Sequence, residues 1–275
     1  MKIELNQEQT DSYRDNGCLI VEEFLSTKEL EILTTAITES VEEMGDWKLS
    51  TAVGSKNERW KQGNEYYDRV FIQRLNLWKI NETVKGFFLD PELGEMLCQL
   101  EGIDGIRVWH DQTLQKQPWA NPTAWHSDDP KWSFHDPHAI SIWIALDDTT
   151  VQNGCMYYLP GSHKLGSYEN VAIREDTGGY FEVFPQFKTV QPIVAEMKAG
   201  DAGFHNGLTA HGAGPNMTPG WRRAMTCAYM PDGATFNGIP NILSQEQIAS
   251  LEVGDDLNDE SQNPLVWSKE MAAGG

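Results

Sequence analysis

The sequence predicts a mainly β protein, a sandwich or jelly roll, with helices flanking it on the N-terminal side. Several short apolar segments separated by turn signals lie between residues 104 and 230. Helical spacing dominates the first 103 residues, and nothing indicates a second core. We therefore expect one domain over 1–275, with helical support at 1–103, a β core at about 104–230 and a tail at 231–275.

The N-terminal part reads as helix, strand, helix. Residues 18–21 form a short apolar run of β type, and Ser26 with Glu29 forms a capping box at the start of a helix. A further helix begins with Pro91 at its first position and ends at Gly102. Apolar residues recur at helical spacing after the capping box at Leu30, Leu33, Ile37 and Val41.

The β core is predicted from short apolar or alternating runs. We expect strands at 106–109, 112–116, 139–146, 155–159, 192–195, 202–205 and 223–230. The segment 165–190 interrupts them and is expected to cover one end of the core. Residues 46–68 are predicted to be a long loop, either a lid or pocket wall or plain surface. A short helix is indicated in the tail by Leu243, Ile248 and Leu251.

Composition excludes several classes of partner. The formal net charge of −20 argues against nucleic acid or an anionic membrane, because both require a basic surface. We interpret the charge as a solubility surface in preference to a sign of cationic substrates. No apolar run has the length of a signal peptide or a membrane span. The scattered cysteines predict free thiols in a reducing cytoplasm: Cys18, Cys98, Cys155 and Cys227.

The residues of a candidate metal site occur in two separate parts of the sequence. His126 and Asp128 are two residues apart, so on a strand they would point to the same side. The third ligand is His205 or His211, and we favour His211 because it stands in a glycine-rich bend that can project a side chain into a cavity. Two imidazoles and one carboxylate bind one face of iron(II) and leave other positions open. Four further histidines are expected to be structural or at the surface: His110, His135, His138 and His163.

An arginine near His211 points to a carboxylate-bearing cofactor. A planar guanidinium binds a carboxylate through two parallel hydrogen bonds and keeps its charge. Arg222 and Arg223 would face opposite sides of a strand, so one of them can reach the pocket, and Arg223 is the competing assignment. The combination indicates an enzyme that uses iron(II), dioxygen and a 2-oxo acid.

With these motifs the chain resembles the phytanoyl-CoA dioxygenase family of iron(II)/2-oxoglutarate enzymes, from Gln7 to about Met230. The order and spacing of the motifs are more specific than any one of them. They are Asp11-Ser12-Tyr13-Arg14-Asp15-Asn16-Gly17, Val21-Glu22-Glu23-Phe24-Leu25, Trp125-His126-Ser127-Asp128, Asn153-Gly154-Cys155, Leu159-Pro160-Gly161-Ser162-His163, His211-Gly212-Ala213-Gly214-Pro215-Asn216 and Arg222.

The resemblance implies a double-stranded β-helix, a cupin-like jelly roll with helices packed outside. It implies that His126, Asp128 and His211 bind iron and that Arg222 binds the distal carboxylate of 2-oxoglutarate. Lys116 resembles the family lysine near this cosubstrate, and Trp143, Trp132 and Ala213 occupy further positions matched to the family's pocket. Trp132 is similar to an aromatic residue of the ectoine hydroxylase branch, and Ala213 stands where many relatives carry a serine that assists the cofactor.

The implied reaction is oxidation, by preference hydroxylation, of an unactivated C–H bond in a small-molecule metabolite, with succinate and carbon dioxide as co-products. Asp128 supports hydroxylation because the related halogenases carry a small residue in its place. The alternatives are a non-catalytic jelly-roll binding protein and a cupin-like enzyme using another metal such as zinc; Arg222 serves neither. Pocket walls are expected from 46–68, 129–138, 165–190 and 231–245.

Overall fold

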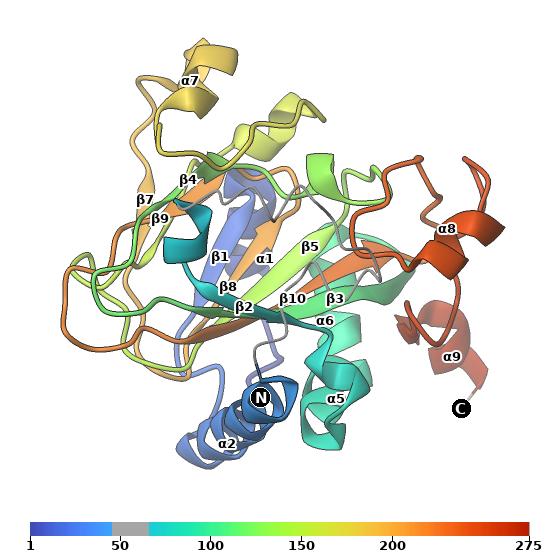
Figure 1. Cartoon of the computed structure of the whole chain (residues 1–275). Helices are drawn as coiled ribbons and strands as arrows, with labels where there is room; N and C mark the ends of the chain where they lie inside the picture. Colours follow the sequence, from blue (N-terminus) through green and yellow to red (C-terminus); the bar gives the residue numbers. More distant parts are fainter. Residues whose placement is uncertain (46–65, 275) are drawn as a thin grey trace.

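Two antiparallel sheets form the centre of the protein (Figure 1). The computed structural model describes residues 1–45 and 66–274, and all strand counts refer to these residues. The larger sheet has seven strands in the order β1-β8-β5-β10-β3-β11, with β2 also paired to β3, and the smaller has four in the order β4-β9-β6-β7. Most of the predicted loop at 46–68 lies outside the described residues.

The strands of the two sheets come from distant parts of the chain. The large sheet contains β1 (Cys18–Val21), β2 (Ile72–Leu75), β3 (Gly105–Gln115), β5 (Ile140–Ala145), β8 (Ala202–Asn206), β10 (Ala224–Pro231) and β11 (Leu265–Ser268). The small sheet contains β4 (Thr123–His126), β6 (Met156–Tyr158), β7 (Ile193–Ala195) and β9 (His211–Ala213).

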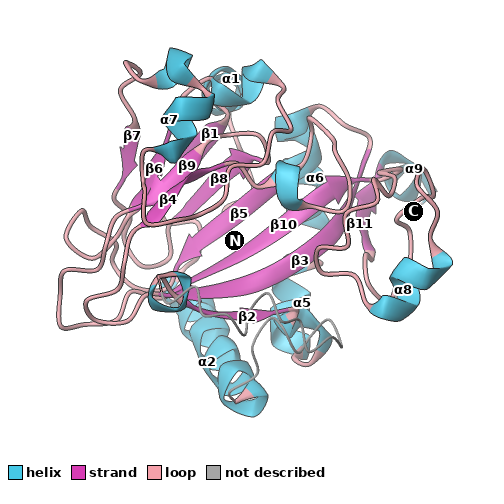
Figure 2. Ribbon diagram, turned by 45° about the horizontal axis from the view of Figure 1, so that its top comes forward, coloured by secondary structure: helices cyan, strands magenta, loops and turns pink. Residues whose placement is uncertain are grey.

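Helices cover one face of the large sheet. The predicted helices are confirmed as α2 (Thr27–Met44), with the Ser26–Glu29 capping box, and α6 (Pro91–Glu101), with Pro91 in its first turn and Gly102 in the left-handed conformation. They pack on the sheet together with α1 (Gln7–Asn16) and α5 (Glu82–Phe88). Figure 2 shows α2 and α5 at the bottom of the view, with the small sheet at the upper left.

Strand β5 shows how the sequence separates the two faces of the large sheet. Ile140, Ile142 and Ile144 belong to the core beneath the helices, while the alternate residues Trp143 and Ala145 belong to a cluster with the small sheet. The alternation explains why every residue of β5 is buried, since both faces of this central strand are covered.

The structure adds to the expected elements and corrects some of them. The two runs predicted at 106–109 and 112–116 form one strand, β3, and His211 begins strand β9 rather than standing in a bend. The pattern did not indicate β2, β4, β11 or the short terminal helix α9 (Lys269–Gly274). The segment 165–190 contains the five-residue helix α7 (Gly179–Val183), and the tail helix is confirmed as α8 (Gln245–Ser250).

Within the described part of the chain, no helix has both the length and the apolar character that crossing a membrane requires.

Candidate active site

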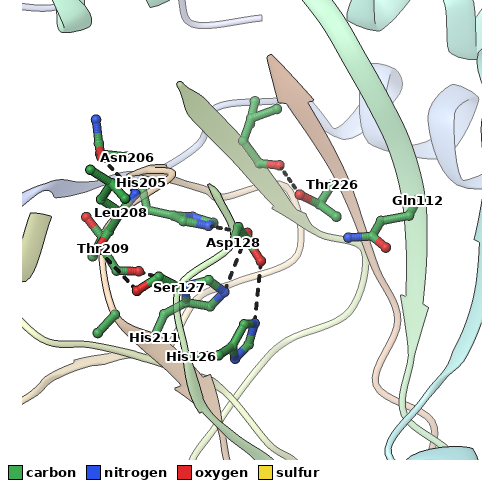
Figure 3. Close-up of polar contacts among 12 residues, drawn as sticks. Gln112, His126, Ser127, Asp128, His205, Asn206, Leu208, Thr209, His211 and Thr226 are labelled. Atoms are coloured by element: carbon green, nitrogen blue, oxygen red, sulfur yellow. Dashed lines mark hydrogen bonds and ion pairs between the residues drawn. The ribbon is translucent and has the colours of Figure 1, made fainter. Parts of the chain in front are cut away.

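His126, Asp128 and His211 come together in the structure, as the sequence predicted. One potential ligand atom from each lies within 4.8 Å of the other two. The Nε2 atom of His126 is 3.5 Å from Oδ1 of Asp128, and that of His211 is 3.8 Å from Oδ2 (Figure 3). The carboxylate therefore lies beside the Nε2 atoms of both imidazole rings, whose centroids are 4.3 Å apart.

Strand pairing and a tight turn position these three side chains. His126 ends β4 and lies directly opposite His211 at the start of β9 in the antiparallel register. The expectation that Asp128 shares a strand with His126 is wrong, because Asp128 has a right-handed helical conformation and precedes a 3-10 turn, η3 (Asp129–Lys131). The backbone N–H groups of Asp128 and Asp129 both donate to the carbonyl of Gly207 at 3.0 Å, which holds this turn beside β8.

Both histidines of the triad have a defined tautomer. Nδ1 of His126 lies 2.8 Å from the carbonyl of Ala124, and Nδ1 of His211 lies 3.0 Å from that of Thr209. A carbonyl only accepts hydrogen bonds, so each Nδ1 carries the proton and each Nε2 keeps a lone pair. This is the arrangement in which an imidazole binds a metal while its other nitrogen is fixed.

His205, the competing third ligand, lies beside the same carboxylate but differs in its bonding. Its Nε2 is 3.5 Å from Oδ2 of Asp128, and its ring centroid is 4.5 Å from that of His211. Neither of its ring nitrogens has a hydrogen-bond partner among the described residues. It is therefore a buried imidazole next to the triad whose tautomer the protein does not fix.

Electrostatics keep the carboxylate ionised and two of the rings neutral. Burial opposes ionisation of Asp128, but the contacts of its carboxylate with His211, His126 and His205 hold its pKa well below the ordinary value. Burial lowers the pKa of His126 and, more strongly, that of His211. An anionic oxygen and two neutral imidazoles are the forms in which these groups bind a cation.

Arg222 lies at the other end of the site. Its guanidinium is buried, is centred 5.4 Å from the ring of Trp143 and donates from Nη1 to the carbonyl of Leu114 at 3.1 Å. Its Nε has no partner among the described residues. Burial lowers the pKa of Arg222 to about 10, which leaves it cationic at neutral pH. Arg223 instead binds Asp147, with its Nη2 2.6 Å from Oδ1.

Lys116 occupies a different place from Arg222. The two residues form an isolated β-bridge, and Nζ of Lys116 donates to the carbonyls of Val70 at 3.2 Å and Asn121 at 2.6 Å. Burial, with the charge of Arg222, lowers the pKa of Lys116 to about 6. The side chain is fully buried and is not among the residues that line the cavity, so its role beside a cofactor stays a prediction.

A cavity of about 540 Å³ joins these groups. It lies between the sheets, because the small sheet contributes His126 and His211 while the large sheet contributes Trp143, His205 and Thr226. Loops complete the wall, as predicted for 129–138, 165–190 and 231–245. The lining residues from these loops are Lys131, Trp132, Asn170, Ala172, Ile173, Asn241 and Ile242.

Sequence reasoning missed His110, which lines the cavity and has an unpartnered Nδ1. Regular alternation would place it on the same side as Val108, which packs under the helices. The register between β3 and β10 shifts at this point, with Val108 opposite Tyr229 and His110 opposite Ala228. The extra residue, Trp109, reverses the alternation and turns His110 into the cavity.

The other three histidines that we expected to be structural or at the surface do not line the cavity. His135 contacts Asp129 through Nδ1 at 3.0 Å, and His138 lies 3.5 Å from a carboxylate oxygen of Glu101. Nε2 of His163 is 3.1 Å from the carbonyl of Arg14.

Comparison with known proteins identifies the family of this chain. The family described as phytanoyl-CoA dioxygenase (PhyH) matches residues 13–224. A probable alpha-ketoglutarate-dependent hypophosphite dioxygenase from Stutzerimonas stutzeri is 25% identical over 232 residues, which cover 81% of this chain and 77% of that protein.

Two solved structures extend the comparison. The non-heme alpha-ketoglutarate-dependent carbocyclase SnoK aligns with a TM-score of 0.75 and 26% identity over 95% of this chain and 96% of its own. The epimerase SnoN, solved with Fe3+, alpha-ketoglutarate and nogalamycin RO, aligns with a TM-score of 0.70 and 23% identity over 94% of this chain and 98% of its own. The chain belongs to the phytanoyl-CoA dioxygenase family and is an iron- and 2-oxoglutarate-dependent dioxygenase.

Proposed function

We propose that His126, Asp128 and His211 hold the iron and that Arg222 holds the distal carboxylate of 2-oxoglutarate. The observation that carries the proposal is the convergence of the three ligand atoms within 4.8 Å on a cavity that Arg222 also lines. The residues present fit both groups. Two imidazole lone pairs and one carboxylate suit a non-heme ferrous ion with open positions, and a buried guanidinium with an unpartnered Nε suits a carboxylate.

The chain's own residues prepare the site for this chemistry. The carbonyls of Ala124 and Thr209 orient the two imidazole ligands, and the ring of Trp143 lies 5.4 Å from the Arg222 guanidinium. Lys116 is proposed to support the same end of the cosubstrate through its bridge to Arg222.

The proposed reaction is hydroxylation of an unactivated C–H bond in a small-molecule metabolite. Bound iron and 2-oxoglutarate supply the oxidising chemistry, in which dioxygen and the oxo acid are consumed and succinate and carbon dioxide are released. Asp128 supports hydroxylation because it supplies a carboxylate ligand where a halogenase would need room for a halide. The relatives' names cover several outcomes, including carbocyclisation and epimerisation, so ring closure at the same centre is the second candidate.

The scaffold of this site is proposed to be a double-stranded β-helix, a jelly roll formed as one domain over 1–275. The support is the pair of antiparallel sheets and the burial of His126, His211, Arg222 and Trp143 between them. We place the enzyme in the cytoplasm, acting on a small molecule and not on nucleic acid or membrane. The four buried free cysteines and the net charge of −20 support this placement.

The test is a screen of metabolites that reads succinate release, followed by variants on the substrate found. His126→Ala and Asp128→Ala should abolish substrate-dependent succinate formation, because each removes a ligand that holds the iron. His138→Ala, which changes a half-exposed imidazole outside the cavity, should behave like the wild type. Turnover at the wild-type rate in either ligand variant would end the proposal.

A further inference from the structure

Lys131 is a cation in the cavity that the proposed site does not use. It ends the η3 turn three residues after Asp128, and its backbone N–H donates to the Asp128 carbonyl at 2.9 Å. The side chain lines the cavity and is partly buried. Among the described residues it makes no ion pair within 4.0 Å and no hydrogen bond, although the attraction of Asp128 reaches it. A cation partly withdrawn from water is stabilised by a nearby negative charge, so this position favours an anionic ligand.

Charge balance in the cavity leads to the same conclusion. With histidines counted as neutral, the charged residues in the described lining are Asp128, Lys131 and Arg222. The iron would offset Asp128, and one carboxylate of 2-oxoglutarate would offset Arg222. Because the dication and the dianion cancel each other, one positive charge remains, and Lys131 is the group left without a counter-charge. A substrate with a single negative charge would complete the balance.

The wall around Lys131 describes the rest of this ligand. Trp132 follows it directly, and Ile173 and Ile242 come from two separate loops to line the same cavity. Asn241 adds a buried Oδ1 that has no hydrogen-bond partner among the described residues. An apolar surface with one cation suits an organic acid with an apolar body, and the Asn241 acceptor suits a hydrogen-bond donor carried by that body rather than the acid group itself.

We propose that Lys131 binds the anionic group of the substrate, so that this enzyme oxidises a C–H bond in a monoanionic organic acid. The inference rests on the proposed function, because it takes the triad and Arg222 as already occupied. Lys131 then selects by charge, and the apolar side chains orient the body of the acid toward the iron. The positive excess in the described cavity lining contrasts with the charge of −20 over the whole protein.

The experiment measures binding rather than turnover. Protein is saturated with Mn2+ and 2-oxoglutarate, and the affinities of straight-chain acids from butanoate to decanoate are compared with those of the matching primary amides by calorimetry. The amides have nearly the same shape and no charge. In the wild type we expect at least one acid to bind about tenfold or more tightly than its amide, the effect of a charge-assisted hydrogen bond. Saturating 2-oxoglutarate keeps the probes away from Arg222.

Variants assign the preference to one side chain. Lys131→Met should bring the ratio of the acid and amide affinities to about one, and Lys131→Arg should keep it above one. Lys188→Met, which changes an exposed lysine outside the cavity, should retain the wild-type ratio. If Lys131→Met does not fold, Lys131→Gln takes its place, with the melting temperature as the check.

Two outcomes overturn the proposal: no acid in the series binds the wild type more tightly than its amide, or the preference persists in Lys131→Met. The failure of the proposed function looks different, because Mn2+ or 2-oxoglutarate would then fail to bind the wild type in the first step. Mn2+ and 2-oxoglutarate should each bind Lys131→Met with wild-type affinity.

Discussion

The hydrogen bonds at Nδ1 distinguish the histidines around Asp128. His126 and His211 each bond the carbonyl two residues earlier in the chain, whereas His205 has no such partner. A ligand whose orientation is already fixed loses less freedom when it binds a metal. His211 is therefore better prepared than His205 to bind iron, although both imidazoles lie within 4 Å of the same carboxylate.

This difference predicts unequal effects of two matched substitutions. His211→Ala removes a ligand, so it should weaken Mn2+ binding by more than the roughly 10- to 100-fold that is lost when a residue hydrogen-bonded to a ligand is replaced. His205→Ala should weaken it by less than about tenfold, because its ring is not needed to hold the ion. Calorimetric titration of both variants with Mn2+ measures the two effects. The reverse order would assign the third ligand to His205.

The pairing of β4 with β9 builds the metal end of the site. Gly212 lies next to His211, and a Cβ atom added there would stand 2.9 Å from the backbone carbonyl oxygen of Thr123 in β4. The close approach of the two strands thus depends on a residue without a side chain. It is this approach that sets His126 opposite His211.

Gly212→Ala should separate the strands. The clash involves backbone on both sides, so we expect a loss of about 1–3 kcal/mol in the free energy of unfolding, together with weaker Mn2+ binding. Urea denaturation and calorimetry measure these effects. Gly220→Ala is the matched control, since its added Cβ would meet nothing closer than 4.0 Å, and it should change stability by no more than about 0.5 kcal/mol. Wild-type stability of Gly212→Ala would show that the strands can part without cost.

At the scale of the whole molecule, one buried carboxyl joins the large sheet to the helical layer. Asp111 in β3 accepts hydrogen bonds from the backbone N–H groups of Leu77 and Trp78, both at 2.7 Å. Burial raises its pKa to about 7, although the two backbone N–H groups act in the opposite direction. An aspartate in an unfolded chain has a pKa of about 3.9.

The stability of the fold should therefore depend on this group between about pH 4 and pH 7. In that window the native protein holds a proton that the unfolded chain has released, so the free energy of unfolding falls as pH rises. Asp111→Asn should be less stable than the wild type at pH 5, and the gap should narrow toward pH 7. Urea denaturation at several pH values measures it, with the exposed Asp256→Asn as control. A gap that stays constant with pH would contradict the prediction.

Local signals predicted more of this structure than long-range ones. Helices α2 and α6 followed from the capping box at Ser26 and Glu29, from Pro91 and from Gly102, which act within a few residues. The pairing of β4 with β9 and the bulge at Trp109 join residues about 85 to 120 positions apart, and the sequence does not specify such partners. The triad was predicted from motifs, but the cavity roles of His110 and Lys131 came from a register shift and a turn visible only in three dimensions.

The origin of the cavity wall has a consequence for how such an enzyme changes in evolution. The triad, Arg222 and Trp143 lie on the strands or within three residues of their ends, whereas Lys131, Ile173 and Asn241 belong to connecting segments. Insertions and replacements are tolerated best in connections. A lineage can therefore acquire a new specificity by exchanging its loops while its oxidising machinery is inherited intact.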